Sequence, residues 1–362
     1  MAEPRLFLRN RSIGQTLFRV AFICSLLLNG YFLLLRDHLD QSVKKDAPVV
    51  VQGVTISEGD SDEGGEKNAP ESSPDQVGAS SAKTLERIAD TVGEVLDKES
   101  GLRLMDLELN KSFAYTFNEA LGSEVGDLVS AFSSRIFMWQ VDLRTDVRKS
   151  DRIRLIYRVL VDDRIVDIRA ASYHSRKHKQ DFEAYWFKPA GHEYGSFYDE
   201  KGSEVPLSLE NSPIKNYEQI TSLLKDRNRH NGIDFKAPIG TPITSPFDGR
   251  VTRVNWRSRN GNCIEVRYTK SGLLARFLHL SKVADGVSAS KSVKGGSVIA
   301  ESGNTGRSTA PHLHYELAKP KNGRIVNPLE FHKTFRKKVP AESMPEFEQI
   351  RDHWRKFFIE AP

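Results

Sequence analysis

The feature that most constrains the fold of this 362-residue chain is a series of short alternating segments in its C-terminal third. Three runs, GRVTRVNW, NCIEVRYT and LLARFLHLS, alternate apolar with polar residues, and turn-forming stretches at 259–261 and 271–272 separate them. A period of two is typical of a β-strand with one buried face, and such short turns join antiparallel neighbours. The sequence therefore predicts a small antiparallel sheet that folds over on itself.

The N-terminal part of the chain carries a membrane signal. Residues 20–36 contain the mostly apolar, uncharged run VAFICSLLLNGYFLLL, and Arg5, Arg9 and Arg11 precede it. With its apolar neighbours the run approaches the ~20 residues that cross a bilayer, and the arginines place residues 1–19 in the cytoplasm. No small-residue cleavage pattern follows, which favours an uncleaved anchor over a signal peptide or a core helix. We expect a single-pass transmembrane helix in the inner membrane.

Residues 37–82 have the composition of a linker. They are acidic, rich in Ser, Gly and Pro, and nearly free of large apolar side chains. Such a segment cannot bury enough surface to offset its ordering entropy, so we expect disorder. Because this segment is acidic, the rest of the chain is more basic than the net charge of +5 for the whole chain suggests. A basic body suits an anionic cell-wall polymer or a membrane surface.

Other features of the sequence exclude some functions. No glycine-rich phosphate loop and no basic recognition helix is present, which argues against a nucleic-acid partner. Cys24 and Cys263 cannot form a disulfide framework. The histidines at 174, 178 and 192 lack paired ligand spacing, and we interpret them as ordinary surface or strand residues.

The pattern of apolar residues over 83–211 predicts an α+β domain. Leu85, Ile88, Val92 and Leu96 recur at helical spacing, and a second helix is expected over 119–132. The runs IRLIYRVLV, RIVDIRAASYH and DFEAYWFKP then alternate as strands. After the C-terminal block of short strands, residues 333–362 contain a helical pattern of aromatic residues, which predicts an amphipathic helix packed on a domain. The fold class expected for the whole chain is mainly β.

Three residues in the C-terminal third of the chain are candidates for metal binding or catalysis. His230 and Asp234 flank Asn231-Gly232, a pair that favours a tight turn, so their side chains can converge. His279 lies in the strand LLARFLHLS between this motif and the next one. Imidazole nitrogen and carboxylate oxygen are both good ligands of zinc.

A second motif, HLHYE, follows near residue 312. In an extended strand its alternation places His312, His314 and Glu316 on one face. A catalytic zinc site uses three protein ligands, so the four histidines and one aspartate of the block, His279 included, leave two imidazoles for proton transfer. No HExxH helix is present, and we interpret Glu316 as a supporting or packing residue rather than a general base.

This block resembles the lysostaphin-like (LytM-type) zinc metallopeptidases through HNGIDFKAPIGTPITSPFDGRV, FLHLS and ESGNTGRSTAPHLHYEL followed by NPLEF. The resemblance implies a peptidase domain over 212–332 with a small antiparallel sheet. It implies that His230, Asp234 and His314 bind Zn²⁺. It also implies that His279 and His312 are the catalytic histidines, which assist a zinc-bound water in attacking the scissile carbonyl.

The same resemblance implies a substrate and a location. Residues 83–211 are more weakly similar to the regulatory or groove-forming region of envelope-anchored members, so we expect them to hold the enzyme inactive. The expected reaction is hydrolysis of peptidoglycan peptide cross-links in the periplasm, at the D-Ala–meso-diaminopimelate bond, with a regulatory envelope protein as a possible partner. The alternative is an inactive LytM-type module that binds and activates a cell-wall amidase. Phe277 departs from the tyrosine common in the family and removes a hydroxyl that could hold substrate.

Overall fold

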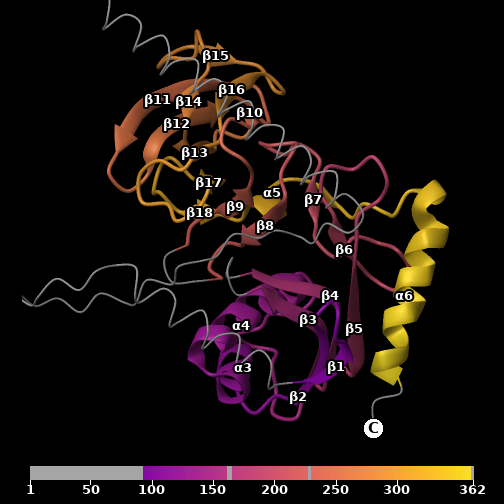
Figure 1. The fold of residues 1–362 in the computed structure, drawn as a ribbon. Coiled ribbons are helices and arrows are strands. Elements are labelled where there is room, and N and C mark those ends of the chain that lie inside the picture. Colours follow the sequence, from indigo (N-terminus) through magenta and orange to yellow (C-terminus); the bar gives the residue numbers. More distant parts are fainter. Residues whose placement is uncertain (1–92, 161–164, 227–229, 360–362) are drawn as a thin grey trace, which may run out of the picture. The chain divides into compact units, whose positions relative to one another are not determined.

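The computed structural model of the protein describes residues 93–160, 165–226 and 230–359 (Figure 1). The expected cytoplasmic segment 1–19, anchor 20–36 and linker 37–82 lie outside these ranges, as do Cys24 and residues 83–92. Within the described ranges, no helix has the length and apolar character needed to cross a membrane.

The first part of the described chain is a six-stranded antiparallel sheet with two helices inserted after its second strand. The strands follow one another in sequence order. They are β1 (Glu94–Asp97), β2 (Leu102–Glu108), β3 (Arg152–Leu160), β4 (Ile165–Ser175), β5 (Gln180–Phe187) and β6 (Ser196–Tyr198), and the helices are α3 (Phe113–Leu121) and α4 (Ser123–Phe137).

Two helix predictions need correction in this region. The helix expected to continue to Leu96 is wrong over 94–97, which form β1 and pair with β2. Gly93 has a φ of 94°, a conformation that breaks a helix. The helix expected over 119–132 is two helices, because Gly122 at φ 78° ends α3 with its N–H bonded to the Asn118 carbonyl, and α4 begins at once.

The C-terminal part contains an eight-stranded antiparallel sheet and a three-stranded one, whose buried residues share one hydrophobic cluster. The larger sheet has the order β15-β11-β12-β13-β17-β9-β8, with β18 beside β17. Its strands are β8 (Gln219–Ser222), β9 (Ile233–Lys236), β11 (Gly249–Arg257), β12 (Gly261–Tyr268), β13 (Leu274–Leu280), β15 (Ser292–Val293), β17 (His312–Ala318) and β18 (Ile325–Val326). The smaller sheet contains β10 (Pro242–Thr244), β14 (Lys282–Val283) and β16 (Val298–Glu301). The three alternating runs of the sequence form β11, β12 and β13.

Short elements complete the chain. β7 (Ser208–Leu209) pairs with β19 (Thr334–Phe335), and α5 (Pro328–Phe331) precedes β19. A 3-10 turn (Ala341–Ser343) leads into α6 (Met344–Ile359). Phe347 and Phe358 are the buried residues of α6, and Phe347 packs against Phe187 of β5 with ring centroids 5.6 Å apart. The apolar face of this helix therefore covers the first sheet beside β5 (Figure 1).

Alternation along β17 separates the core from the site. Leu313, Tyr315 and Leu317 are fully buried in the hydrophobic cluster of the C-terminal part. Phe277 belongs to the same cluster and lies against Tyr315, with ring centroids 5.3 Å apart. Its difference from the tyrosine of related sequences therefore falls in the core, and the expectation that it affects substrate contact is wrong.

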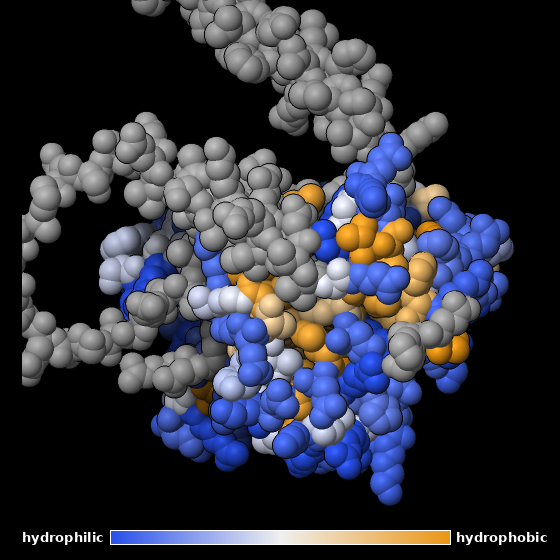
Figure 2. Space-filling view, turned by 60° about the horizontal axis from the view of Figure 1, so that its bottom comes forward, coloured by the Kyte–Doolittle hydropathy of each residue, from blue (hydrophilic) through white to orange (hydrophobic). Residues whose placement is uncertain are grey.

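Polar residues cover most of the face shown in Figure 2, with apolar residues in smaller patches between them. Some large apolar side chains of the described chain are nevertheless exposed, such as Trp256 at 61% and Ile239 at 59%. Scattered exposure of this kind is normal for a folded protein.

One buried histidine makes folding stability depend on pH. His332 is buried beside Tyr315, whose hydroxyl lies 3.1 Å from His332 Nε2. Burial lowers the pKa of His332 to about 4. In the unfolded chain His332 has an ordinary pKa near 6.5, so between about pH 6.5 and 4 it binds a proton that it does not bind in the folded chain. The stability contributed by His332 is therefore complete above about pH 6.5 and is lost as the pH falls towards 4.

We predict that His332→Phe flattens this pH dependence. Between pH 7.5 and 5 the free energy of unfolding of the unaltered protein should fall by about 2 kcal/mol more than that of the variant. Denaturant titrations at the two pH values measure both changes. Equal losses in the two proteins would contradict the assignment, whatever the absolute stability of the variant.

Candidate metal centre and its neighbouring histidines

The pairing of β9 with β17 builds the site. In this antiparallel register Asp234 of β9 lies directly opposite His314 of β17. Side chains opposite each other on one face of a sheet are close neighbours. His230 lies just before β9, and one ligand-type atom from each of these three buried residues lies within 4.8 Å of the others.

A glycine permits this approach. A Cβ at Gly232 would lie 2.4 Å from the Tyr315 carbonyl oxygen and 2.9 Å from His314 Nε2, so no larger residue fits without displacement. The prediction of a tight turn at Asn231-Gly232 is wrong, because the chain reverses earlier, between β8 and β9, where the Lys225 N–H donates to the His230 carbonyl. Gly232 serves close packing against β17 instead of a turn.

The ring of His230 is oriented by the backbone. Its Nδ1 donates to the Leu223 carbonyl oxygen at 2.7 Å, which turns Nε2 towards Asp234. Nε2 lies 3.1 Å from Asp234 Oδ2, yet it makes no hydrogen bond of normal geometry with any described residue. A buried nitrogen that faces a carboxylate without a well-formed hydrogen bond is suited to a shared cation.

His314 is held from both sides. Its Nδ1 lies 2.6 Å from Asp234 Oδ1, and its Nε2 lies 3.1 Å from Glu316 Oε1. The other carboxylate oxygen of Glu316 accepts from Arg276 at 2.9 Å. With the proton on Nε2 donated to Glu316, Nδ1 becomes the nitrogen that faces the ligand cluster.

The electrostatics of the cluster favour positive charge. Burial lowers the pKa of His230, but the carboxylates of Asp226 and Asp234 raise it by more, to about 10. Burial likewise lowers the pKa of His314, and Asp234 and Glu316 raise it above its ordinary value. Burial raises the pKa of Asp234, whereas the two imidazoles lower it well below its usual range. The cluster therefore attracts a cation, and a metal ion that binds there must displace protons.

Two more histidines adjoin this cluster. The ring centroid of His279 lies 4.7 Å from that of His312 and 6.1 Å from that of His314. His279 Nδ1 donates to the Thr305 carbonyl at 2.8 Å, and His312 Nδ1 donates to the Ala310 carbonyl at 2.7 Å. Both rings therefore carry a proton on Nδ1 and present Nε2 as the basic nitrogen. Burial lowers the pKa of His279 to about 4, so this imidazole is neutral at pH 7.

The backbone at His279 is unusual. His279 has a φ of 64°, a left-handed conformation that costs a non-glycine residue about 1–3 kcal/mol. The Asn260 carbonyl accepts its N–H at 2.9 Å. Gly261, at φ 64°, packs so closely on Thr305 that a Cβ would lie 2.2 Å from the Thr305 hydroxyl. The turn after β11 and the loop around Thr305 thus fix this histidine together.

The structure brings together all five side chains singled out from the sequence. Glu316, interpreted as supporting, contacts His314 directly. The sequence motifs do not reveal the backbone carbonyls of Leu223, Thr305 and Ala310 that orient the rings, because any residue type supplies a carbonyl. They also miss Asp226, whose carboxylate lies 3.3 Å from His230 Nδ1.

The donor set fits a metal ion with three protein ligands and leaves two basic imidazoles beside it. Two imidazoles and one carboxylate, all buried and convergent, are the ligand types of catalytic zinc sites. A metal centre with adjacent proton acceptors defines the class of metal-dependent hydrolases.

Comparison with known proteins identifies the domain that holds this site. Residues 228–328 match Peptidase family M23, so the chain carries an M23 peptidase domain, and the family predicted from the motifs is confirmed. The chain is 31% identical over 255 residues to peptidoglycan DD-endopeptidase ShyA of Vibrio cholerae, covering 66% of this chain and 55% of that protein. It is 38% identical over 135 residues to peptidoglycan DD-endopeptidase ShyB of the same organism, covering 34% of this chain and 31% of that protein.

A solved structure of a zinc-containing peptidase from Vibrio cholerae is 29% identical to this chain. The alignment covers 62% of this chain and 69% of that one, with a TM-score of 0.30. The chain spans about half the length, or less, of the curated relatives it matches. The family assignment therefore rests on the sequence match over 228–328.

We predict that Glu316→Gln weakens metal binding. The glutamine amide oxygen is an uncharged and weaker acceptor for the His314 proton on Nε2, and changes of this kind lower metal affinity about 10- to 100-fold. Competition of the purified protein with a chromophoric chelator for Zn²⁺ measures the affinity.

Glu301→Gln is the matched control, because Glu301 is partly buried in β16 and, among the described residues, its side chain forms no hydrogen bond or ion pair with the cluster. Equal Zn²⁺ affinity of Glu316→Gln and the unaltered protein would refute the orienting role of Glu316.

Proposed function

We propose that this protein is a zinc-dependent endopeptidase that hydrolyses peptide cross-links of bacterial peptidoglycan. The observation that carries the proposal is the convergence of His230, Asp234 and His314 beside two further histidines in an M23 domain. The relatives named peptidoglycan DD-endopeptidases support the substrate. The alternative of an inactive, amidase-activating module is disfavoured because all five site residues are present.

In this proposal His230, Asp234 and His314 hold the zinc ion. Their nitrogen and oxygen donors and their single negative charge match the preferences of Zn²⁺. When bound, the ion supplies Lewis-acid chemistry for attack on a peptide carbonyl. Glu316 keeps the His314 ring in one orientation through the 3.1 Å contact with Nε2.

His279 and His312 handle protons in the reaction. Each ring has its Nδ1 proton tied to a backbone carbonyl, so proton exchange takes place at Nε2. Burial lowers the pKa of His279, so its ring is neutral at pH 7 and the lone pair of Nε2 is available to a proton of the attacking water. The same proton can pass to the amine that leaves when the peptide bond breaks. His312 stands nearer to Asp234, with Nε2 3.8 Å from Oδ1, and its imidazolium form, which carries a proton on Nε2 as well, can donate to the oxyanion.

We further propose the D-Ala–meso-diaminopimelate bond as the cleavage site, with the domain in the periplasm and the chain anchored in the inner membrane by residues 20–36. The names of the DD-endopeptidase relatives support the bond, and the apolar run after the N-terminal arginines supports the location. The partners are then peptidoglycan stem peptides and a regulatory envelope protein.

Digestion of purified sacculi tests the reaction. The protein should release uncross-linked muropeptides whose masses identify the broken bond, and His314→Ala should lower the rate at least about a hundredfold because a ligand is lost. His192→Ala, which removes an exposed histidine, is the control. If His314→Ala is as active as the unaltered protein, the site does not carry out the reaction.

We also propose that residues 83–211 restrain the peptidase domain. Arg144, just after α4, donates from Nη1 to the Lys225 carbonyl at 2.9 Å, in the connection that leads to His230. Trp139 packs against the hydrophobic cluster of the C-terminal part. The Arg144 bond therefore reaches the segment that positions the first ligand, and Trp139 adds a contact with the core of the same part.

Arg144→Gln should therefore raise turnover of soluble cross-linked muropeptides a few-fold, as expected for loss of one charge-assisted hydrogen bond in a two-state equilibrium. Arg148→Gln is the matched control, since the Arg148 side chain donates to the neighbouring carbonyls of Thr145 and Val147 and, among the described residues, bonds to nothing in the C-terminal part. Unchanged or lower turnover with intact folding would count against restraint.

A further inference from the structure

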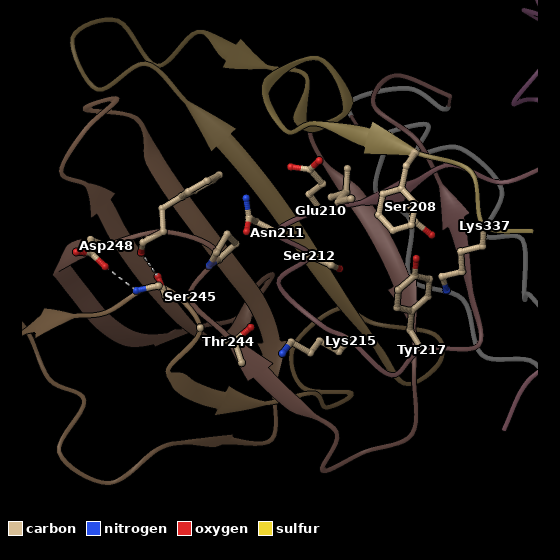
Figure 3. Close-up of a pocket in the computed structure, with 16 residues that line it drawn as sticks. Ser208, Glu210, Asn211, Ser212, Lys215, Tyr217, Thr244, Ser245, Asp248 and Lys337 are labelled. Carbon is tan, nitrogen blue, oxygen red and sulfur yellow. Dashed lines mark hydrogen bonds between the residues drawn. The ribbon is translucent and has the colours of Figure 1, made fainter. Parts of the chain in front are cut away.

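A second concave site lies outside the metal centre. It has a volume of about 660 Å³ and is lined by residues from four segments of the sequence, namely 208–217, 244–248, 295–296 and 335–337 (Figure 3). The volume lies within the usual range of small-molecule and oligomer-fragment sites.

The walls of this pocket are fixed by backbone pairing. β7 pairs with β19 on one side, and the Thr244 N–H donates to the Pro213 carbonyl at 2.8 Å on the other. The Gly296 N–H donates to the Ser245 carbonyl, and the Gly295 N–H donates to Asp248 Oδ1, each at 2.8 Å. The cavity is therefore preformed, which reduces the entropy lost when a ligand binds.

The pocket is remote from the catalytic histidines. Asp248 lines it and immediately precedes β11, whereas Asn260, just beyond the other end of β11, bonds to His279. A strand of nine residues spans roughly 30 Å. A molecule in the pocket therefore does not touch His279.

The charges of the pocket favour an anionic ligand. Its two acidic residues have lysine partners outside the lining: Asp248 lies 3.0 Å from Lys294, and Glu210 lies 3.9 Å from Lys333. The two lining lysines, Lys215 and Lys337, are exposed and have no acidic partner among the residues that the structure describes. Two ammonium groups are thus available to carboxylates.

The remaining lining combines apolar and hydrogen-bonding groups. Phe335 is 44% exposed at the pocket, and Tyr217 is held against Phe235 with ring centroids 5.1 Å apart. In Figure 3 Asn211 and Lys215 lie between Asp248 at one end and Tyr217 with Lys337 at the other. Flat apolar faces beside amide, hydroxyl and ammonium groups match a ligand with both a ring and carboxylates.

We propose that this pocket is a second binding site for peptidoglycan, taking a carboxylate-bearing disaccharide–peptide unit of the strand while the metal centre acts elsewhere on the polymer. The proposal rests on the proposed function for its polymer, but not on the catalytic residues. Lys215 and Lys337 bind the carboxylates, and Phe335 offers its exposed ring to the apolar face of a sugar.

Binding of the uncross-linked disaccharide–tetrapeptide to the full chain, followed by isothermal titration calorimetry, tests the proposal. The double variant Lys215→Gln/Lys337→Gln should bind at least about fivefold more weakly, because two charge-assisted contacts are lost. Lys215→Arg/Lys337→Arg should retain binding. The matched control is Lys319→Gln/Lys321→Gln, which removes the same charge from exposed lysines beyond β17.

Separate titrations with the disaccharide alone and with the tetrapeptide alone identify which half of the unit supplies the contacts. Turnover of a small soluble cross-linked dimer should be unchanged in the pocket variant, because its catalytic side chains are intact. Undetectable binding by the unaltered protein, or equal binding by the two glutamine variants, overturns the proposal. If the protein binds the unit through these lysines but cleaves no cross-linked dimer, the proposed function is rejected and the binding site is supported.

Discussion

The site depends first on the pairing of β9 with β17. Backbone hydrogen bonds between these strands place Asp234 opposite His314 and bring His230 in from the segment before β9. A shift of one residue would turn Asp234 into the core and expose Phe235, because strand side chains alternate between faces. The fully buried Phe235, Leu313 and Tyr315 oppose that shift. Hydrophobic burial on one face thus sets the position of the polar cluster on the other.

Backbone carbonyls fix the orientation of three of the histidine rings. Leu223, Thr305 and Ala310 each accept the Nδ1 proton of one histidine. Each of these bonds selects one tautomer and leaves Nε2 towards the cluster. His314 is the exception, since the Glu316 carboxylate accepts a hydrogen bond from its Nε2 and Nδ1 therefore faces the cluster. The two arrangements show that the nitrogen presented to the centre is decided by the neighbours of each ring.

Sequence patterns predicted the sheet and the convergence of the five side chains because alternation and motif spacing depend on local geometry. They failed where tertiary contacts decide. Residues 94–97 follow a helical pattern but form a strand, because Gly93 breaks the helix and β2 offers a pairing edge. Asn231-Gly232 is a common turn pair, yet the space beside Tyr315 is what requires the glycine. The carbonyls that orient the imidazoles leave no trace in residue type at all.

The charged chain behind His314 has a consequence for the response to salt. Glu316 contacts Arg276, Arg276 lies 3.5 Å from Glu265, and the guanidinium groups of Arg253 and Arg257 approach the same carboxylate at 3.8 and 3.7 Å. The arginine side chains are 51% exposed at Arg253, 37% at Arg257 and 27% at Arg276, whereas the carboxylates of Glu265 and Glu316 are only 8% and 12% exposed. Dissolved ions screen exposed charges much more strongly than buried ones. Raising the ionic strength should therefore loosen the outer arginines first, while the carboxylate that holds the ligand histidine remains insulated.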